Sequence, residues 1–191
     1  MPRLVVGMSG ASGQILGIRL LQVLREREDV ETHLVMSAAA RATIVQETSW
    51  SPDAVAALAD VVYRPEDVGA AIASGSFATV GMIVVPCSIK TLSAVAHSYA
   101  SDLLTRAADV TLKEGRPLLL VVRETPLHLG HLRLMVQAAE VGAIIFPPVP
   151  AFYARPRSLE EVVDHLVGRM LARLGIGNAL FPEWRGMRGE G

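Results

Sequence analysis

Residues 4–13 read LVVGMSGASG, an apolar run that passes directly into a turn rich in glycine and serine. Apolar residues then recur at helical spacing, at Ile15, Ile18, Leu21 and Leu24. This order predicts a strand, a tight turn and a helix. Backbone N–H groups and two hydroxyls would then lie at a helix N-terminus, where a phosphate or another anion is favoured. A turn that only lets the helix pack closely on the strand is the alternative.

Beyond this segment, the chain alternates apolar strands with helices along its whole length. The strands are expected at residues 4–8, 30–36, 82–86, 118–122 and 143–146. Further helices are expected at 37–48, from 52, from 88, at 103–114 and at 158–174. This alternation predicts a single-domain α/β protein with a doubly wound parallel sheet, which binds ligands at the carboxyl ends of its strands. We expect the domain over residues 1–174 and a tail without its own core over 175–191.

Two segments carry finer expectations. The last helix should open with a capping box at residues 158–161. It should bury a stripe formed by Val162, Leu166, Met170 and Leu174. Residues 63–76 should be the least regular part of the chain.

Composition excludes several classes of protein. The 191 residues carry a net charge of −1 and no basic run, which argues against a nucleic-acid partner and favours a small molecule. The apolar runs are too short to span a bilayer and the N-terminus lacks a signal-peptide core, so a cytoplasmic protein is expected. Oligomerisation is one way to bury the surplus of apolar surface that 51% hydrophobic residues imply. The single cysteine, Cys87, rules out an internal disulfide and a cysteine-type zinc site, and should be buried.

A second hydroxyl-rich turn follows the strand that ends at Val85. Ser88, Lys90 and Thr91 lie where the next helix begins, so the two turns together suggest one phosphorylated ligand between them. Taken alone, Ser88 is better explained as a helix N-cap and Lys90 as a solvated side chain. The first turn does not match the dinucleotide fingerprint, and Ser37 replaces the acid that would bind a ribose hydroxyl, so NAD is disfavoured.

Two groups of charged residues are candidates for chemistry. Arg106, Asp109 and Lys113 share one helix face, and a surface ladder of ion pairs is the favoured interpretation. Arg123 and Glu124 end a fully apolar strand at the sheet edge where a ligand belongs. They pair a cation with a carboxylate that can act as an acid, and the alternative is a salt bridge that fastens a loop.

Histidine and tyrosine residues give weaker signals. His128 and His131 are three residues apart, but no acidic or cysteine ligand is placed to complete a metal site, so capping, packing or surface roles are favoured. Tyr153 follows a proline-rich passage at 147–150, and Arg169 lies beside the apolar stripe of the last helix. Each of these two would be an ordinary residue on its own.

Seven segments taken together resemble the flavin prenyltransferase family, whose members were long called aromatic-acid or 3-octaprenyl-4-hydroxybenzoate decarboxylases. They span nearly the whole chain and lie at 9–13, 74–77, 86–92, 106–110, 112–114, 123–126 and 151–153. Within the family the sequence is most similar to members associated with ubiquinone biosynthesis. The resemblance implies a flavodoxin-like fold of three layers and a homo-oligomer, commonly a dodecamer, with FMN near the subunit interfaces.

The resemblance also implies a set of site residues, carried over position by position. Those that match the FMN contacts of the family are Gly10, Ala11, Ser12, Ser37, Ser88, Ile89, Lys90, Thr91 and Arg123. Those that match its contacts to dimethylallyl phosphate are Arg106, Lys113, Arg123, Tyr153 and Arg169. Glu47 and Glu124 match acidic residues of its reaction site.

The chemistry that the resemblance implies is transfer of a dimethylallyl group to N5 and then C6 of reduced FMN, without a metal. Negative charge accumulates on the leaving phosphate, so arginine side chains and Lys113 would stabilise it. Glu124 would give the departing phosphate a proton, and Ser12 with Glu47 would relay the proton lost at ring closure. A decarboxylase that depends on prenylated FMN would receive the product.

Two alternatives stay open. An FMN-dependent cysteine decarboxylase of the phosphopantothenoylcysteine type would share the fold and the cofactor, but its Pro-Ala-Ser-Ala-Asn-Thr turn is replaced here by PCSIKT at 86–91. A non-catalytic flavin carrier would need the FMN turns but not the cations and acid of the phosphate site. Whether the donor is a mono- or a diphosphate is also open, as is whether Trp184 reaches the prenyl pocket.

Overall fold

The computed structural model of the chain describes residues 1–184 and 186. The chain forms two compact units, Met1–Pro148 and Val149–Gly191. The first unit holds a parallel sheet between two layers of helices, as predicted, and the second holds a long helix. The division at residue 174 that the sequence suggests stays a prediction.

The sheet of the first unit has its strands all parallel, in the order β3-β2-β1-β4-β5-β6. The strands are β1 (Arg3–Met8), β2 (Glu31–Met36), β3 (Val61–Tyr63), β4 (Gly81–Cys87), β5 (Leu118–Val122) and β6 (Ile144–Ile145). When the short edge strand β3 is left aside, the other strands follow the order 2-1-3-4-5 of flavodoxin. The flavodoxin-like, doubly wound parallel sheet is therefore confirmed.

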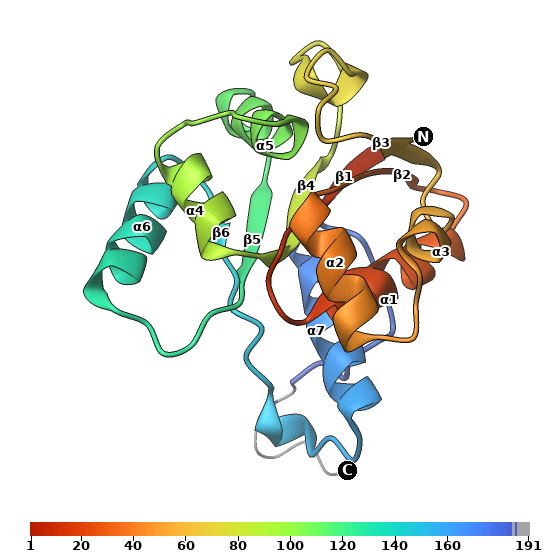
Figure 1. The fold of residues 1–191 in the computed structure, drawn as a ribbon. Helices are drawn as coiled ribbons and strands as arrows, with labels where there is room; N and C mark the ends of the chain where they lie inside the picture. Colours follow the sequence, from red (N-terminus) through yellow and green to blue (C-terminus); the bar gives the residue numbers. More distant parts are fainter. Residues whose placement is uncertain (185, 187–191) are drawn as a thin grey trace. The chain divides into compact units, whose positions relative to one another are not determined.

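Helices cover both faces of this sheet (Figure 1). On one face lies α1 (Gln14–Arg25), followed along the chain by α2 (Ala38–Glu47) and α3 (Pro52–Ala56). On the other face lies α5 (Leu103–Lys113), with α4 (Ile89–Ala96) and α6 (Leu129–Glu140) beside it and the short 3-10 turn η1 (Ala71–Ala73) packed on it. The predicted three-layer arrangement follows.

Strands β4 and β5 are buried along their entire length, as their continuous apolar sequences predict for strands covered on both faces. Val84 of β4 packs with Leu92 of α4 and Leu104 of α5 in one apolar cluster. On the opposite face, Gly17 of α1 lies so close to β4 that an added Cβ would be 2.6 Å from the carbonyl oxygen of Val85. Because only glycine fits there, α1 packs directly on β4 and fixes the position of the turn before it.

Two elements were not predicted from the sequence. Strand β3 has only three residues, just before the irregular segment at 63–76, and so offers no alternation to detect. Helix α6 buries only Ala138, while Leu129, Leu132 and Val136 are exposed. Because its apolar residues do not gather in one buried stripe, its helical period is weak.

The second unit contains the 3-10 turn η2 (Phe152–Ala154) and helix α7 (Leu159–Arg173). Ser158 caps α7 by accepting a hydrogen bond from the N–H of Glu161 at 3.2 Å, as predicted. The carboxylate of Glu161 in turn accepts a hydrogen bond from the N–H of Arg157 at 2.7 Å, so the reciprocal bond comes from the residue before the cap.

The buried stripe of α7 differs from the predicted one. Its buried apolar side chains are Val163, Leu166, Val167, Met170 and Leu171, whereas Val162 and Leu174 are only half-buried. Successive steps of four residues overshoot one full turn of 3.6 residues, so a stripe drawn at constant spacing drifts off the buried face. None of the helices in residues 1–184 is long and apolar enough to cross a lipid bilayer.

Candidate active site

A cleft of about 880 Å³ opens at the carboxyl edge of the sheet, where the chain leaves the neighbouring strands β1 and β4. The helices that follow these two strands cover opposite faces, and doubly wound sheets bind their ligands at such a point. The lining residues are Ser9, Gly10, Ser37, Ala38, Ala39, Pro65, Glu66, Val68, Ser88, Ile89, Lys90, Thr91, Ser101, Asp102, Leu104 and Glu124. The cleft therefore lies at the edge of the sheet where the sequence predicts a ligand site.

A buried serine ties the two hydroxyl-rich turns together. The Oγ of Ser9 donates to the carbonyl oxygen of Pro86 at 2.9 Å and accepts a hydrogen bond from the N–H of Ser88 at 2.8 Å. Ser9 is almost fully buried, so both bonds are shielded from water. Sequence reasoning missed this role because the partner turn lies far along the chain, although the hydroxyl beside Gly10 was a usable signal.

Two helix N-termini open into the cleft. Ser37 caps α2 by accepting a hydrogen bond from the N–H of Ala40 at 3.0 Å, and Ser88 caps α4 by accepting one from the N–H of Thr91 at 3.3 Å. The first N–H groups of a helix favour negative charge, so a phosphate-bearing ligand suits this edge. The predicted FMN contacts that line the cleft are Gly10, Ser37, Ser88, Ile89, Lys90 and Thr91.

At the N-terminus of α1, the anion is supplied by the protein itself. The Oε2 of Glu47 accepts hydrogen bonds from the N–H groups of Gly13 at 2.9 Å and Gln14 at 3.2 Å. The N–H of Ala11 donates to the carbonyl oxygen of Ser9 at 2.9 Å. These three N–H groups are therefore hydrogen-bonded within the chain. Of the anion site predicted at the first turn, only the part around Gly10 is left to bind a ligand.

Glu47 and Ser12, the predicted proton relay, lie together. Burial by itself would raise the pKa of Glu47, but the hydrogen bonds from the Ser12 side chain and from the N–H groups of Gly13 and Gln14, with the charge of Arg123, lower it overall. The carboxylate is therefore ionised at neutral pH. An ionised carboxylate beside a hydroxyl is suited to accept a proton.

Replacing Glu47 with glutamine should destabilise the protein by about 1 kcal/mol at pH 7, because an uncharged amide serves the N-terminus of α1 less well. The pKa of Glu47 is lowered by folding from about 4.5, so its contribution is present above that value and is lost as the pH falls through the folded-state pKa. Urea unfolding at pH 7 and pH 3 measures both effects. Glu28→Gln, in an exposed loop, is the control, and an equal loss for Glu47→Gln at both pH values would contradict the assignment.

Lys90 and Glu124 line the cleft, and Arg123 directly precedes Glu124 in the chain. The Nζ of Lys90 lies 3.6 Å from a carboxylate oxygen of Asp102, and its side chain is largely exposed. The N–H of Arg123 donates to the carbonyl oxygen of Cys87 at 3.1 Å, which continues the pairing of β5 with β4. The carboxylate of Glu124 accepts a hydrogen bond from the N–H of Thr125 at 3.0 Å and lines the cleft, as expected for a group that meets the ligand.

Arg106 and Lys113 lie on α5 at increasing distance from the cleft. Asp102 caps this helix and lines the cleft, whereas Lys113 is its last residue, about 15 Å further along the axis. Arg106 pairs with Asp109 at 3.1 Å, so the predicted ion pair is present, but Lys113 pairs with Glu114 instead. Within one chain, Lys113 and the cleft are therefore at opposite ends of α5.

Tyr153 and Arg169 are linked through His165 within the second unit. The Oη of Tyr153 lies 3.3 Å from Nε2 of His165. His165 and Arg169 are four residues apart on α7, so their side chains share one face of the helix. The guanidinium of Arg169 lies 5.8 Å from the ring centre of Phe181, whose ring also contacts His165. The structure thus brings the two predicted phosphate ligands of this unit to neighbouring positions.

Two further residues behave as the sequence indicates. The Nδ1 of His128 accepts hydrogen bonds from the N–H groups of Gly130 and His131 at the start of α6, which confirms the capping role. Cys87 is fully buried, and this burial raises the pKa of its thiol far above the usual range. Its side chain therefore acts as a small apolar group.

Comparison with known proteins narrows the class that the cleft defines. The Flavoprotein family model matches residues 1–171. Flavin prenyltransferase UbiX of Escherichia coli K12 is 62% identical over 188 residues, covering 97% of this chain and 100% of that protein. The mitochondrial flavin prenyltransferase PAD1 of Saccharomyces cerevisiae is 54% identical over 188 residues, covering 98% of this chain and 77% of that protein.

Solved structures agree with these relatives. AnUbiX (PadA1), crystallised with FMN and dimethylallyl pyrophosphate, superposes with a TM-score of 0.95 at 51% identity, covering 98% of this chain and 99% of that one. A dodecameric FMN-dependent UbiX-like decarboxylase from Escherichia coli O157:H7 gives a TM-score of 0.94 at 50% identity, covering 96% and 100%. The FMN-dependent cysteine decarboxylase SpaF, at 21% identity and a TM-score of 0.60, shares the fold alone.

The parallel sheet, its cleft at β1 and β4 and the matching family model define this protein as an α/β flavoprotein. The flavin cofactor of this protein is FMN, and the N-termini of α2 and α4 at the cleft suit its phosphate. Within the class, the chain belongs to the flavin prenyltransferase family.

Proposed function

We propose that this protein transfers the dimethylallyl group of dimethylallyl phosphate to N5 and C6 of reduced FMN, which makes prenylated FMN. The carboxylate of Glu124 lines the same cleft as two helix N-termini suited to a flavin phosphate, and this observation carries the proposal. The 62% identity to a flavin prenyltransferase supports it. Reduced FMN supplies the nucleophilic nitrogen and carbon of the reaction.

The flavin phosphate is bound at the N-termini of α2 and α4 in this proposal. The exposed N–H groups beside Ser37 and Ser88 donate to it, and the hydroxyl of Thr91 and the side chain of Lys90 lie at the same edge. Gly10 lets the first turn approach α2 closely, because an added Cβ would clash with the Cβ of Ala39. Arg123 completes the set of FMN contacts.

Glu124 protonates the departing phosphate as the carbon–oxygen bond of the donor breaks and the phosphate takes the electron pair. The charge that develops on the phosphate is stabilised by cations and by one hydroxyl. These groups are Arg106, Lys113, Arg123, Tyr153 and Arg169. Ser12 and Glu47 then take up the proton released at ring closure, which the carboxylate can do because its lowered pKa keeps it ionised at neutral pH.

The active protein is a homo-oligomer in this proposal, as one similar structure is described as dodecameric. Apolar side chains left exposed on α6 support a contact with another copy: Leu129, Leu132 and Val136. The position of Lys113, about 15 Å along α5 from the cleft, supports its acting on the donor bound at a neighbouring copy's cleft. A site shared between copies would explain why isolated charged residues look ordinary in the sequence.

In this proposal, another enzyme consumes the product. A partner decarboxylase that depends on prenylated FMN is the proposed recipient. The reaction needs FMN in its reduced form, which a flavin reductant must supply, and the cytoplasm is the proposed location.

A mass measurement tests this function. Purified protein is incubated with reduced FMN and dimethylallyl monophosphate, and in parallel with the diphosphate, and the extracted flavin is analysed by mass spectrometry. The flavin mass should increase by one five-carbon prenyl unit with a donor and stay unchanged without one. Flavin that is bound but unmodified, while a known prenyltransferase modifies it in parallel, would reject the transferase and leave a flavin carrier.

A further inference from the structure

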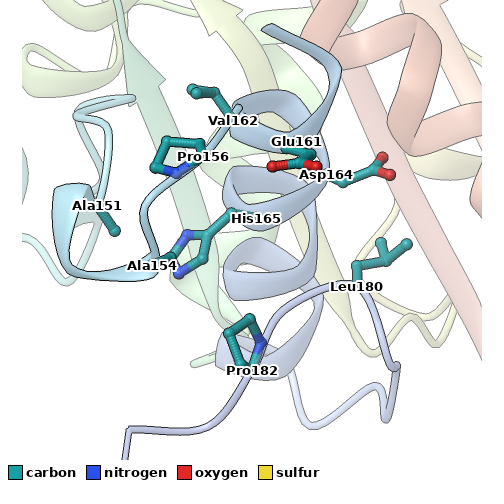
Figure 2. A pocket seen from close by; sticks show the side chains of 9 residues that line it. All are labelled: Ala151, Ala154, Pro156, Glu161, Val162, Asp164, His165, Leu180 and Pro182. Carbon is teal, nitrogen blue, oxygen red and sulfur yellow. The ribbon is translucent and has the colours of Figure 1, made fainter. Parts of the chain in front are cut away.

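Helix α7 presents a buried histidine to the tyrosine that is proposed to bind the donor phosphate. Figure 2 shows His165 reaching from α7 toward the segment of Ala151 and Ala154, across a pocket of about 190 Å³. Its Nε2 lies 3.3 Å from the Oη of Tyr153, and the two rings meet edge to face at 5.8 Å. Only 8% of His165 is exposed, whereas 47% of Tyr153 is. The tyrosine is thus anchored at its buried side and open on the other.

The surroundings of His165 fix its orientation. The ring centres of Phe181 and His165 are 5.4 Å apart, and the ring of Trp184 meets that of Tyr153 edge to face at 5.3 Å. These rings leave His165 and Tyr153 little freedom to separate. The contact between them is therefore a fixed feature of the second unit.

His165 is neutral at physiological pH. Burial lowers the pKa of its imidazole, and the positive charge of Arg169, one turn along α7, lowers it further. A neutral imidazole carries one proton, on either Nδ1 or Nε2. Its Nδ1 is buried and has no hydrogen-bond partner among residues 1–184. An unpaired buried N–H is rarer than an unpaired acceptor, so the proton belongs on Nε2, facing Tyr153.

We propose that His165 is a positioning residue that donates a hydrogen bond from Nε2 to the Oη of Tyr153 and thereby directs the tyrosine hydroxyl proton toward the donor phosphate. With its oxygen occupied on the buried side, Tyr153 has its O–H free to donate on the exposed side. Arg169 lies on the same face of α7 as His165. The hydroxyl of Tyr153 and the guanidinium of Arg169 can therefore bind the same anion. This inference rests on the proposed function, because it assigns the orientation of one of its phosphate ligands.

Variants at two positions test the inference in the full-length oligomer with reduced FMN and dimethylallyl monophosphate. His165→Leu removes the N–H group that donates a hydrogen bond to Tyr153. The KM of this variant for dimethylallyl monophosphate should rise about 3- to 10-fold, with an unchanged affinity for FMN. His165→Gln restores an N–H donor of similar length and should return the KM to within about 2-fold of the unmodified protein. In a Tyr153→Phe background, His165→Leu should add no further change, because the group that it positions is gone.

Several results would overturn the inference. These are a KM for His165→Leu equal to that of the unmodified protein, equal effects of leucine and glutamine, or effects of His165→Leu and Tyr153→Phe that multiply. If His165→Leu does not fold, His165→Asn replaces it, since its shorter amide should fail to reach Tyr153 and raise the KM likewise. Unmodified protein that leaves the flavin unchanged would reject the proposed function itself, whereas an active protein with a silent His165→Leu would reject only the positioning role.

Discussion

Glu124→Gln should reduce the turnover number by about 100-fold or more while FMN remains bound, because an amide cannot protonate the leaving phosphate. The substitution keeps the size of the side chain and an oxygen able to accept the hydrogen bond from Thr125. The cleft should therefore keep its shape. Single-turnover formation of prenylated FMN, followed by flavin mass, measures the chemical step, and a separate titration measures FMN affinity.

The matched control for this variant is Glu26→Gln. Glu26 is an exposed carboxylate at the C-cap of α1, outside the lining of the cleft. Its replacement should leave both turnover and FMN affinity within about 2-fold. Loss of FMN in Glu124→Gln would move this residue from proton transfer to cofactor binding, and unchanged turnover would remove it from the site.

Arg169→Ala should raise the KM for dimethylallyl monophosphate by about 10- to 100-fold, because hydrogen bonds from a guanidinium to a phosphate are among the strongest that side chains make. The guanidinium lies 5.8 Å from the ring centre of Phe181, which also contacts His165, the residue beside the Oη of Tyr153. FMN affinity should not change, since the flavin phosphate is assigned to α2 and α4. Initial rates at varied donor concentration give the KM.

Arg173→Ala supplies the comparison, because Arg173 is an exposed arginine one turn further along α7 and carries no proposed role. It should leave the KM for the donor within about 2-fold. Equal effects of the two variants would mean that the general positive charge of α7 attracts the donor. Arg169 would then lose its assignment as a specific ligand.

The layered fold was predictable because local and global signals agree. The continuous apolar sequences of β4 and β5 match strands covered on both faces, and β5 has the predicted bounds. Ser88 and Ser158 cap the helices that their residue types predict. Strand β3 and helix α6 were not predicted, because β3 is too short and α6 too exposed to show a periodic pattern of apolar residues.

The sequence predicted the location of the candidate site but not the hydrogen bonds that hold it together. Hydroxyl-rich turns after strands located the cleft, since parallel strands end at one edge of the sheet. The bonds of Ser9 to the second turn and of Glu47 to the N-terminus of α1 join segments that are far apart along the chain. Such contacts depend on packing geometry and leave no local pattern, and the same is true of His165 beside Tyr153.

The proposed reaction depends most on one arrangement: a flavin held at the cleft of one copy, with the side chains that bind the donor phosphate beside it. A crystal structure of the oligomer with FMN and dimethylallyl monophosphate measures this directly. We expect the phosphate of the donor within hydrogen-bonding distance of Tyr153, Arg169 and Lys113, and the dimethylallyl carbon beside N5 of the flavin. A structure in which these three side chains share no cavity, with all neighbouring copies included, would contradict the account.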